Sequence, residues 1–172
     1  MIRYGLLLFS LLGACQRVSE PPAAAVEESS TRGQVQRFDF GTTDGEELSS
    51  QTTHGRVTVL VLVTTFDLAS QVAAKRLNQV LHAHRPRINA AAVVLEAAKY
   101  APLADAFRSV LELSYPVALA DLATLQQDST FADVVSVPTL LVLDSEGREV
   151  TRKTGNFTVP ELEAWLVRAE HP

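Results

Sequence analysis

The sequence predicts an α/β fold in which a central mixed β-sheet is flanked by helices. An unbroken apolar run rich in β-branched residues, at positions 57–63, is typical of a strand buried on both faces. It leads directly into a helical pattern at 68–84, and strand and helix patterns follow one another to the end of the chain. This order places the strand at 57–63 in the middle of the sheet.

The composition suits one folded domain with a leader and a linker. Hydrophobic residues make up 47% of the 172 residues, which is enough to bury a core. The net charge is −5 with acids and bases interleaved, so no basic surface for nucleic acid is predicted. No apolar run reaches the roughly 18 residues of a membrane-spanning helix. The single cysteine, Cys15, excludes an internal disulfide, a CxxC pair and a multi-cysteine metal site.

Residues 1–14 have the pattern of a secretory signal. Arg3 precedes an apolar run at 6–12, and small residues then lead to Cys15. The segment LGAC at 12–15 resembles a bacterial lipobox, which implies cleavage before Cys15 and attachment of diacylglycerol to its sulfur. An ordinary signal peptide followed by a chance cysteine is the alternative.

Lipidation at Cys15 implies a membrane anchor in the bacterial cell envelope, because two or three acyl chains bind stably. In some bacteria an aspartate after the cysteine retains lipoproteins at the inner membrane, so Gln16 favours the outer membrane. Residues 15–34 are rich in Pro, Ala, Ser and Glu and lack apolar periodicity, which predicts a flexible linker. The domain at 35–172 would then face the periplasm or the cell exterior.

The predicted domain opens with a short hairpin and the central strand. Phe38 and Phe40 alternate with a polar residue, and the segment TDG at 43–45 is a hairpin-type turn signal. A helix is predicted at 68–84, and Asp67 is a good N-cap for it. Pro86 ends that helix. Its apolar stripe is predicted to contain Ala73, Leu77, Val80, Leu81 and His84.

The middle of the domain predicts a strand at 88–95, a helix at 102–113 and a short strand at 115–120. Residues 122–134 are mixed and are expected to form a helix or turn across the edge of the sheet. The apolar face of the helix at 102–113 is predicted to comprise Leu103, Ala106, Phe107, Val110 and Leu111.

The last part predicts a hairpin and a capped helix. Strands at 140–143 and 148–153 flank the turn DSEG at 144–147. Thr158 and Glu161 have capping-box spacing, with a proline just inside the helix. The final helix is expected to pack Leu162, Trp165 and Leu166. The full order is βαβαβ, then a ββ hairpin, then α.

This order, with VPTLLVLDSEG near its end, resembles the thioredoxin superfamily, and more narrowly the TlpA-like membrane-tethered thiol–disulfide oxidoreductases of bacterial envelopes. The resemblance covers roughly residues 38–167. It places Phe66 at the family's tryptophan, Asp67 at the attacking cysteine and Ser70 at the resolving cysteine. The triplet Val137, Pro138 and Thr139 matches the family's loop, which carries a cis-proline facing the active site. The resemblance therefore implies a thioredoxin-like fold for this chain.

The resemblance fails at the two residues that carry the family's chemistry. Thiol–disulfide exchange needs a thiolate, and neither Asp67 nor Ser70 supplies one. Peroxidase chemistry needs a cysteine thiolate as well. Asp67 instead places a carboxylate at the positive end of the helix dipole, where it serves as a cap; a role as general base or ligand is the alternative. Nothing near Ser70 in sequence would activate it as a nucleophile.

No metal or cofactor site is predicted. Copper-chaperone relatives of this fold use two cysteines and a histidine, and both cysteines are missing here. His82 and His84 are one residue apart and point to different faces of a helix. His54 lies in a predicted loop, and His171 lies in the tail.

The loop around Pro138 leaves a binding function open. In relatives it lines a groove where an extended peptide pairs with the backbone, and such strand addition needs no cysteine; the alternative is that Pro138 only shapes a turn. We therefore expect a redox-inactive, lipid-anchored module that binds an envelope protein or peptide. One alternative is a thiol–disulfide oxidoreductase or peroxidase that uses an unlipidated Cys15 or a partner's cysteine. Another is an accessory envelope protein without a groove function.

Overall fold

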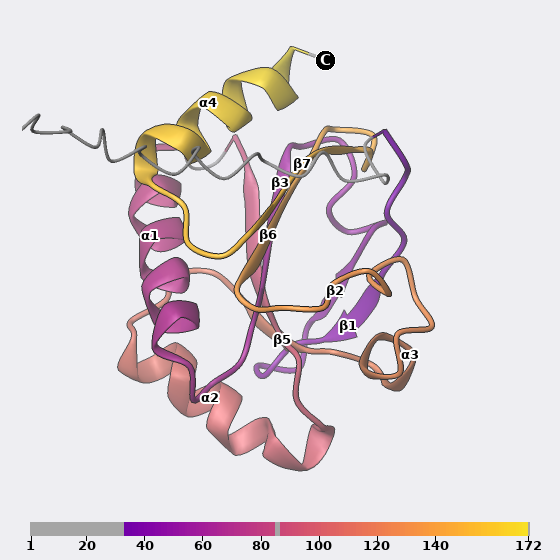
Figure 1. The fold of residues 1–172 in the computed structure, drawn as a ribbon, viewed down its shortest axis with the longest axis vertical. Coiled ribbons are helices and arrows are strands. Elements are labelled where there is room, and N and C mark those ends of the chain that lie inside the picture. Colours follow the sequence, from indigo (N-terminus) through magenta and orange to yellow (C-terminus); the bar gives the residue numbers. More distant parts are fainter. Residues whose placement is uncertain (1–32, 85–86, 172) are drawn as a thin grey trace, which may run out of the picture.

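The structure is a computed structural model that describes residues 33–84 and 87–171 (Figure 1). The predicted signal, Cys15 and nearly all of the predicted linker lie outside the described residues, as does Pro86. In chain order the elements are β1 (Asp39–Gly41), β2 (Glu47–Ser49), β3 (Thr58–Val63), α1 (Leu68–His84), β4 (Asn89–Val94), η1 (Ala98–Tyr100), α2 (Ala101–Val110), β5 (Val117–Leu119), α3 (Leu122–Leu125), β6 (Thr139–Leu143), β7 (Glu149–Thr154) and α4 (Val159–Glu170).

A five-stranded mixed sheet with the order β5-β4-β3-β6-β7 forms the centre of the domain. Strands β3, β4 and β5 run parallel, whereas β6 and β7 run antiparallel to their neighbours. Every residue of β3 is buried, which explains its continuous apolar sequence. The predicted α/β fold and the position of the central strand are confirmed.

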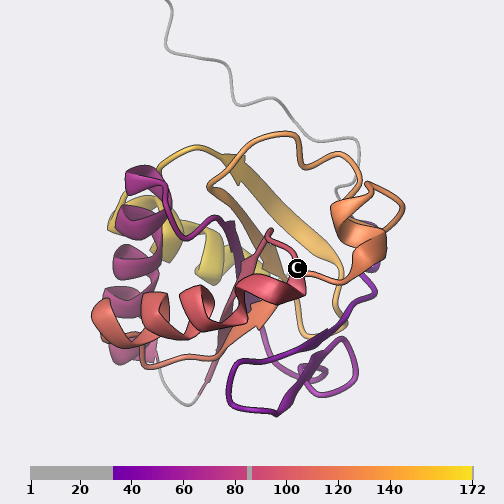
Figure 2. The ribbon, with the colours of Figure 1, turned by 90° about the horizontal axis from the view of Figure 1, so that it is seen from below.

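Helices α1, α2 and α4 cover one face of the sheet, and the N-terminal hairpin and α3 lie on the other (Figures 1 and 2). One core cluster joins alternate residues of β3 to the buried sides of α1, α2 and α4. The other cluster packs the remaining β3 side chains against Phe38, Phe40 and Leu48 of the hairpin and against Phe131, which follows α3. Both faces of β3 therefore contribute to the core. No helix in the described ranges is long and apolar enough to cross a membrane.

The chain before the hairpin extends the edge of the sheet. The Gly33 amide donates to the Glu149 carbonyl at 2.7 Å, and the Glu149 amide donates to the Gln34 carbonyl at 2.9 Å. Val35 forms an antiparallel bridge with Arg148. Residues 33–36 thus pair with the start of β7 and with the turn before it, and they add to this edge of the sheet.

Two details of the predicted helices are wrong. Helix α2 ends at Val110, and Glu112 then adopts a positive φ of 54°. Its buried side chains are Ala104 and Phe107, whereas Leu103 and Val110 are 51% and 78% exposed. Ala106 is exposed as well, so the predicted apolar face is largely a surface. In α1, His84 lies at the helix end and is only half-buried.

The final helix begins as the sequence predicts. Thr158 and Glu161 form a reciprocal capping box, in which the Glu161 carboxylate accepts from the Thr158 amide at 2.7 Å. Leu162 and Leu166 are buried, and Trp165 packs at the margin of the core.

Tyr115 is the largest fully buried side chain and connects two layers. Its hydroxyl donates to the Ala74 carbonyl in α1 at 2.8 Å. Burial raises the pKa of the Tyr115 hydroxyl far above its usual 10.0. The folded protein therefore holds this hydroxyl neutral, and ionisation would oppose folding.

We expect Tyr115→Phe to lower the free energy of unfolding by about 1 kcal/mol, because one buried hydrogen bond is lost. The raised folded pKa contributes stability that is full below about pH 10 and is lost as pH rises above it. The variant should therefore lose stability less steeply than the parent at alkaline pH. Urea unfolding at several pH values measures both effects. Tyr100→Phe, at a 43% exposed position, is the control and should change neither quantity.

Candidate functional site

The junction between β3 and α1 is organised by the carboxylate of Asp67. Its Oδ2 accepts hydrogen bonds from the Ser70 amide at 2.8 Å and from the Ser70 hydroxyl at 2.9 Å. Its Oδ1 accepts from the Ala69 amide at 3.3 Å. Asp67 therefore caps the unpaired amides at the start of α1, as the sequence predicts.

These bonds lower the pKa of the Asp67 carboxyl below its usual 3.8. The Ser70 amide makes the largest contribution, and the Ser70 hydroxyl and the Ala69 amide act in the same direction. Asp67 is therefore ionised at neutral pH. A carboxylate with a lowered pKa is a poor general base near pH 7, so the arrangement favours the capping role.

Ser70 is unsuited to act as a nucleophile. Its side chain is fully buried, and its hydroxyl donates to Asp67. The same oxygen accepts from the Thr64 amide at 3.2 Å. The hydroxyl thus ties the end of β3 to the first turn of α1, and a substrate cannot reach it.

A second carboxylate, from Glu96, fixes the same turn. Its Oε1 accepts from the Thr65 amide at 2.6 Å and from the Thr65 hydroxyl at 2.8 Å. Glu96 follows β4, which lies beside β3 and runs parallel to it. Sequence reasoning missed Glu96, although carboxyl ends of parallel strands meet at one edge of a sheet. The place of Glu96 shortly after a predicted strand was the signal in the sequence that could have revealed it.

The loop with Pro138 lies at this same edge of the sheet. Thr139 begins β6 and pairs with Leu62 near the end of β3. The Val137–Pro138 bond is cis, and the Pro138 carbonyl accepts from the Gly155 amide at 2.7 Å. Pro138 and Thr139 are buried, and Val137 is half-buried. The structure therefore brings the Val137–Thr139 triplet and the β3–α1 junction to one end of the molecule.

Large apolar side chains project from this end. Phe66 is 81% exposed and Leu68 is 72% exposed, at the junction itself. Val135 is 84% exposed in the loop before the cis-proline. We call Phe66, Leu68 and residues 135–137 the docking surface. Large apolar side chains exposed at one end of a molecule mark interaction sites more often than scattered ones do.

An apolar hollow of about 320 Å³ adjoins the docking surface. It lies between the start of α1 and helix α2, and it explains where the unexpectedly exposed face of α2 points. Its lining residues are Thr65, Phe66, Gln71, Leu103, Ala106, Phe107, Val110 and Leu111.

The histidines lie away from this end or at the protein surface. His54 and His171 are exposed, and the His82 ring lies 2.6 Å from the Asn78 carbonyl. In the described part of the chain, no three His, Cys, Asp or Glu side chains are grouped so that they could hold a metal ion.

Asp67→Ala should lower the thermal midpoint by about 2–5 °C, because three hydrogen bonds to the helix start are lost. The lowered folded pKa means that this stabilisation is present above about pH 4 and disappears as pH falls through the folded pKa. The difference between the thermal midpoints of the two proteins should therefore shrink as the pH is lowered below about 4. Thermal unfolding followed by circular dichroism measures this. Asp128→Ala, at an exposed position, is the control; a midpoint difference independent of pH would contradict the charge-based account.

No protein-family model and no curated protein sequence matches this chain. Its structure matches the thiol:disulfide interchange protein of the thioredoxin family from Chlorobium tepidum, with a TM-score of 0.66 and 18% identity, over 82% of this chain and 98% of that chain. A DsbF homologue from Corynebacterium diphtheriae matches with a TM-score of 0.70 and 14% identity, over 87% and 96%. StoA from Bacillus subtilis matches with 0.60 and 21%, over 74% and 94%. The chain therefore has a thioredoxin-like fold.

Proposed function

We propose that this chain is a redox-inactive, thioredoxin-fold protein of the bacterial cell envelope that binds a protein or peptide segment through the docking surface. One observation carries the proposal. Phe66 and Val135 are each more than 80% exposed and stand at an end of the sheet where residues 33–84 and 87–171 supply no thiol. Exposed aromatic and aliphatic groups favour partner binding through burial of apolar area.

Residues 33–84 and 87–171 contain no cysteine, which argues against oxidoreductase chemistry. Cys15 is the single cysteine of the chain and is predicted to carry lipid. At the positions where the resembling family has cysteines, Asp67 is an ionised cap and Ser70 is buried. Neither a carboxylate nor a hydroxyl can form the mixed disulfide that exchange requires.

Backbone groups beside Val135 support binding of an extended segment. Within residues 33–84 and 87–171, no group accepts a hydrogen bond from the Ser136 or Val137 amide. Backbone amides are strong donors that seek partners. An added strand could accept from them while its side chains contact Phe66 and Leu68. The apolar hollow next to Phe66 offers room for one such side chain.

The proposed location rests on the leader. The signal pattern at 1–14 and the lipobox-like segment ending at Cys15 support export and lipid attachment, with the outer membrane favoured by Gln16. The binding domain would then be held near a membrane, which raises the effective concentration of partners in the same compartment.

A redox assay tests the first part of the proposal. The purified full-length chain should show no reduction of insulin disulfides by dithiothreitol above the uncatalysed rate. Turnover above that rate would sink the redox-inactive assignment. If Cys15→Ser then abolished the turnover, the oxidoreductase alternative that uses Cys15 would replace it.

Photo-crosslinking in living cells tests the binding part. With p-benzoylphenylalanine in place of Phe66, we expect one dominant protein adduct; the same probe at Val167, which is 58% exposed on α4, should not give that adduct. A second substitution, Val135→Asp, should lower the adduct yield by about tenfold, because a charge would be buried at the contact. Leu122→Asp, at a 67% exposed position on α3, is its matched control. No adduct at Phe66, or an adduct insensitive to Val135→Asp, would contradict binding at the docking surface.

A further inference from the structure

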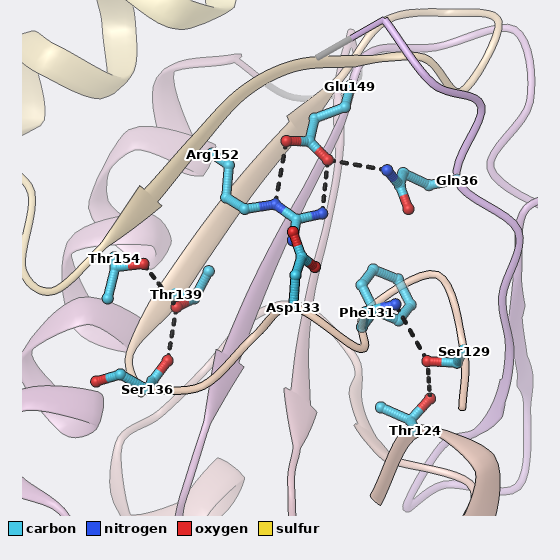
Figure 3. Close-up of polar contacts among 10 residues, drawn as sticks. All are labelled: Gln36, Thr124, Ser129, Phe131, Asp133, Ser136, Thr139, Glu149, Arg152 and Thr154. Atoms are coloured by element: carbon cyan, nitrogen blue, oxygen red, sulfur yellow. Dashed lines mark hydrogen bonds and ion pairs between the residues drawn. The ribbon is translucent and has the colours of Figure 1, made fainter. Parts of the chain in front are cut away.

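A buried ionic network lies beside the loop that carries residues 135–137 of the docking surface (Figure 3). The Arg152 side chain is only 6% exposed, and the Glu149 side chain only 1%. Arg152 donates from Nε to Glu149 Oε1 at 3.0 Å and from Nη2 to Oε2 at 2.7 Å. The Gln36 side-chain amide donates to the same Oε2 at 2.9 Å. Arg152 and Glu149, both in β7, thus form a bidentate ion pair.

Arg152 also reaches a third segment. Its Nη1 donates to Asp133 Oδ1, and the Asp133 side chain is 41% exposed. Glu149 already binds the guanidinium through two hydrogen bonds, and Asp133 is a second carboxylate on the same group. A planar group with five donors in fixed directions can hold two carboxylates at once, which a lysine ammonium does less rigidly. The arrangement therefore fixes geometry, in this case that of the loop around Asp133.

The rest of that loop shows why this contact matters. On its N-terminal side, the Phe131 amide donates to Ser129 Oγ at 3.1 Å, and the Phe131 ring packs on Phe38 and Phe40. On its C-terminal side, Thr139 Oγ1 donates to the Ser136 carbonyl at 2.7 Å. Among the described residues, the bond from Arg152 is the one hydrogen bond by which residues 132–135 reach an element distant in sequence.

We propose that Arg152 is a positioning residue for the docking surface, and that it acts by holding Asp133. Asp133 lies two residues before Val135, so its place sets the direction of the Val135 side chain and of the Ser136 and Val137 amides. The Gly155–Pro138 bond anchors the other end of the loop, and both anchors come from β7 and the turn after it. The inference rests on the proposed function and assigns the residues that prepare its surface for a partner.

Hydrogen exchange in the full-length chain tests the positioning itself and needs no partner. The Val134 amide, which donates to the Phe131 carbonyl at 2.9 Å, reports on the loop. Asp133→Asn should speed its exchange by about tenfold, because the bond from Arg152 that holds the loop then has a neutral acceptor and loses its charge assistance. Asp128→Asn, the same change at an exposed acid of the same connection, should leave it unchanged, and Asp133→Glu should restore most of the protection. Equal exchange in Asp133→Asn and the parent protein would overturn the proposal.

Crosslinking from the Phe66 probe tests the link to binding. Asp133→Asn should lower the adduct yield severalfold while the thermal midpoint stays within about 2 °C, since Asp133 is half-exposed. Faster Val134 exchange with an undiminished adduct would overturn the role in binding. If the Phe66 probe gave no adduct even in the protein with Asp133 intact, the proposed function would be contradicted instead. The exchange experiment would still decide whether Arg152 positions the loop.

Discussion

Burial of β3 on both faces is the constraint from which the rest of the domain follows. Its six residues are each at most 2% exposed, so helices must cover one face and the hairpin the other. Its neighbours β4 and β6 occupy both of its edges. The first part of the chain after β3 that is free of these neighbours is the turn with Phe66 and Asp67. Both the turn and the loop before β6 are consequently brought to one end of the molecule, and there they form the docking surface.

The β3–α1 junction holds a negatively charged group at the start of a helix. A helix start stabilises a negative group through its unpaired amides and its dipole. Asp67 provides that negative group permanently, with its pKa lowered by the amides that it caps. The hydroxyl of Ser70 has two local partners, so the polar group of this side chain is satisfied. The helix start is thus well satisfied, and the exposed chemistry of this end is apolar.

The sequence predicted what local pattern determines. The run at 57–63, the cap at Asp67 and the capping box at Thr158 were each found because their signals lie within a few residues. The face of α2 was misjudged, since periodicity reveals an apolar stripe but not whether another element covers it. Glu96 bonds to Thr65 across 31 positions and Arg152 to Asp133 across 19, and no short-range rule links such pairs. These two contacts form because the order of strands in the sheet brings distant segments together, and that order is known only from the structure.

The pairing of residues 33–36 with β7 also connects the start of the described chain to the group of side chains that holds the loop at Asp133. A load applied to the chain before Gly33 enters the sheet through its edge strand, at the bonds that Gly33 and Gln34 make with Glu149. From there it is passed through Gln36 and Glu149 to the guanidinium that holds Asp133. If the proposed lipid anchor holds the protein through the chain before Gly33, a pull on that chain would therefore act on the same group of atoms that holds the loop at Asp133.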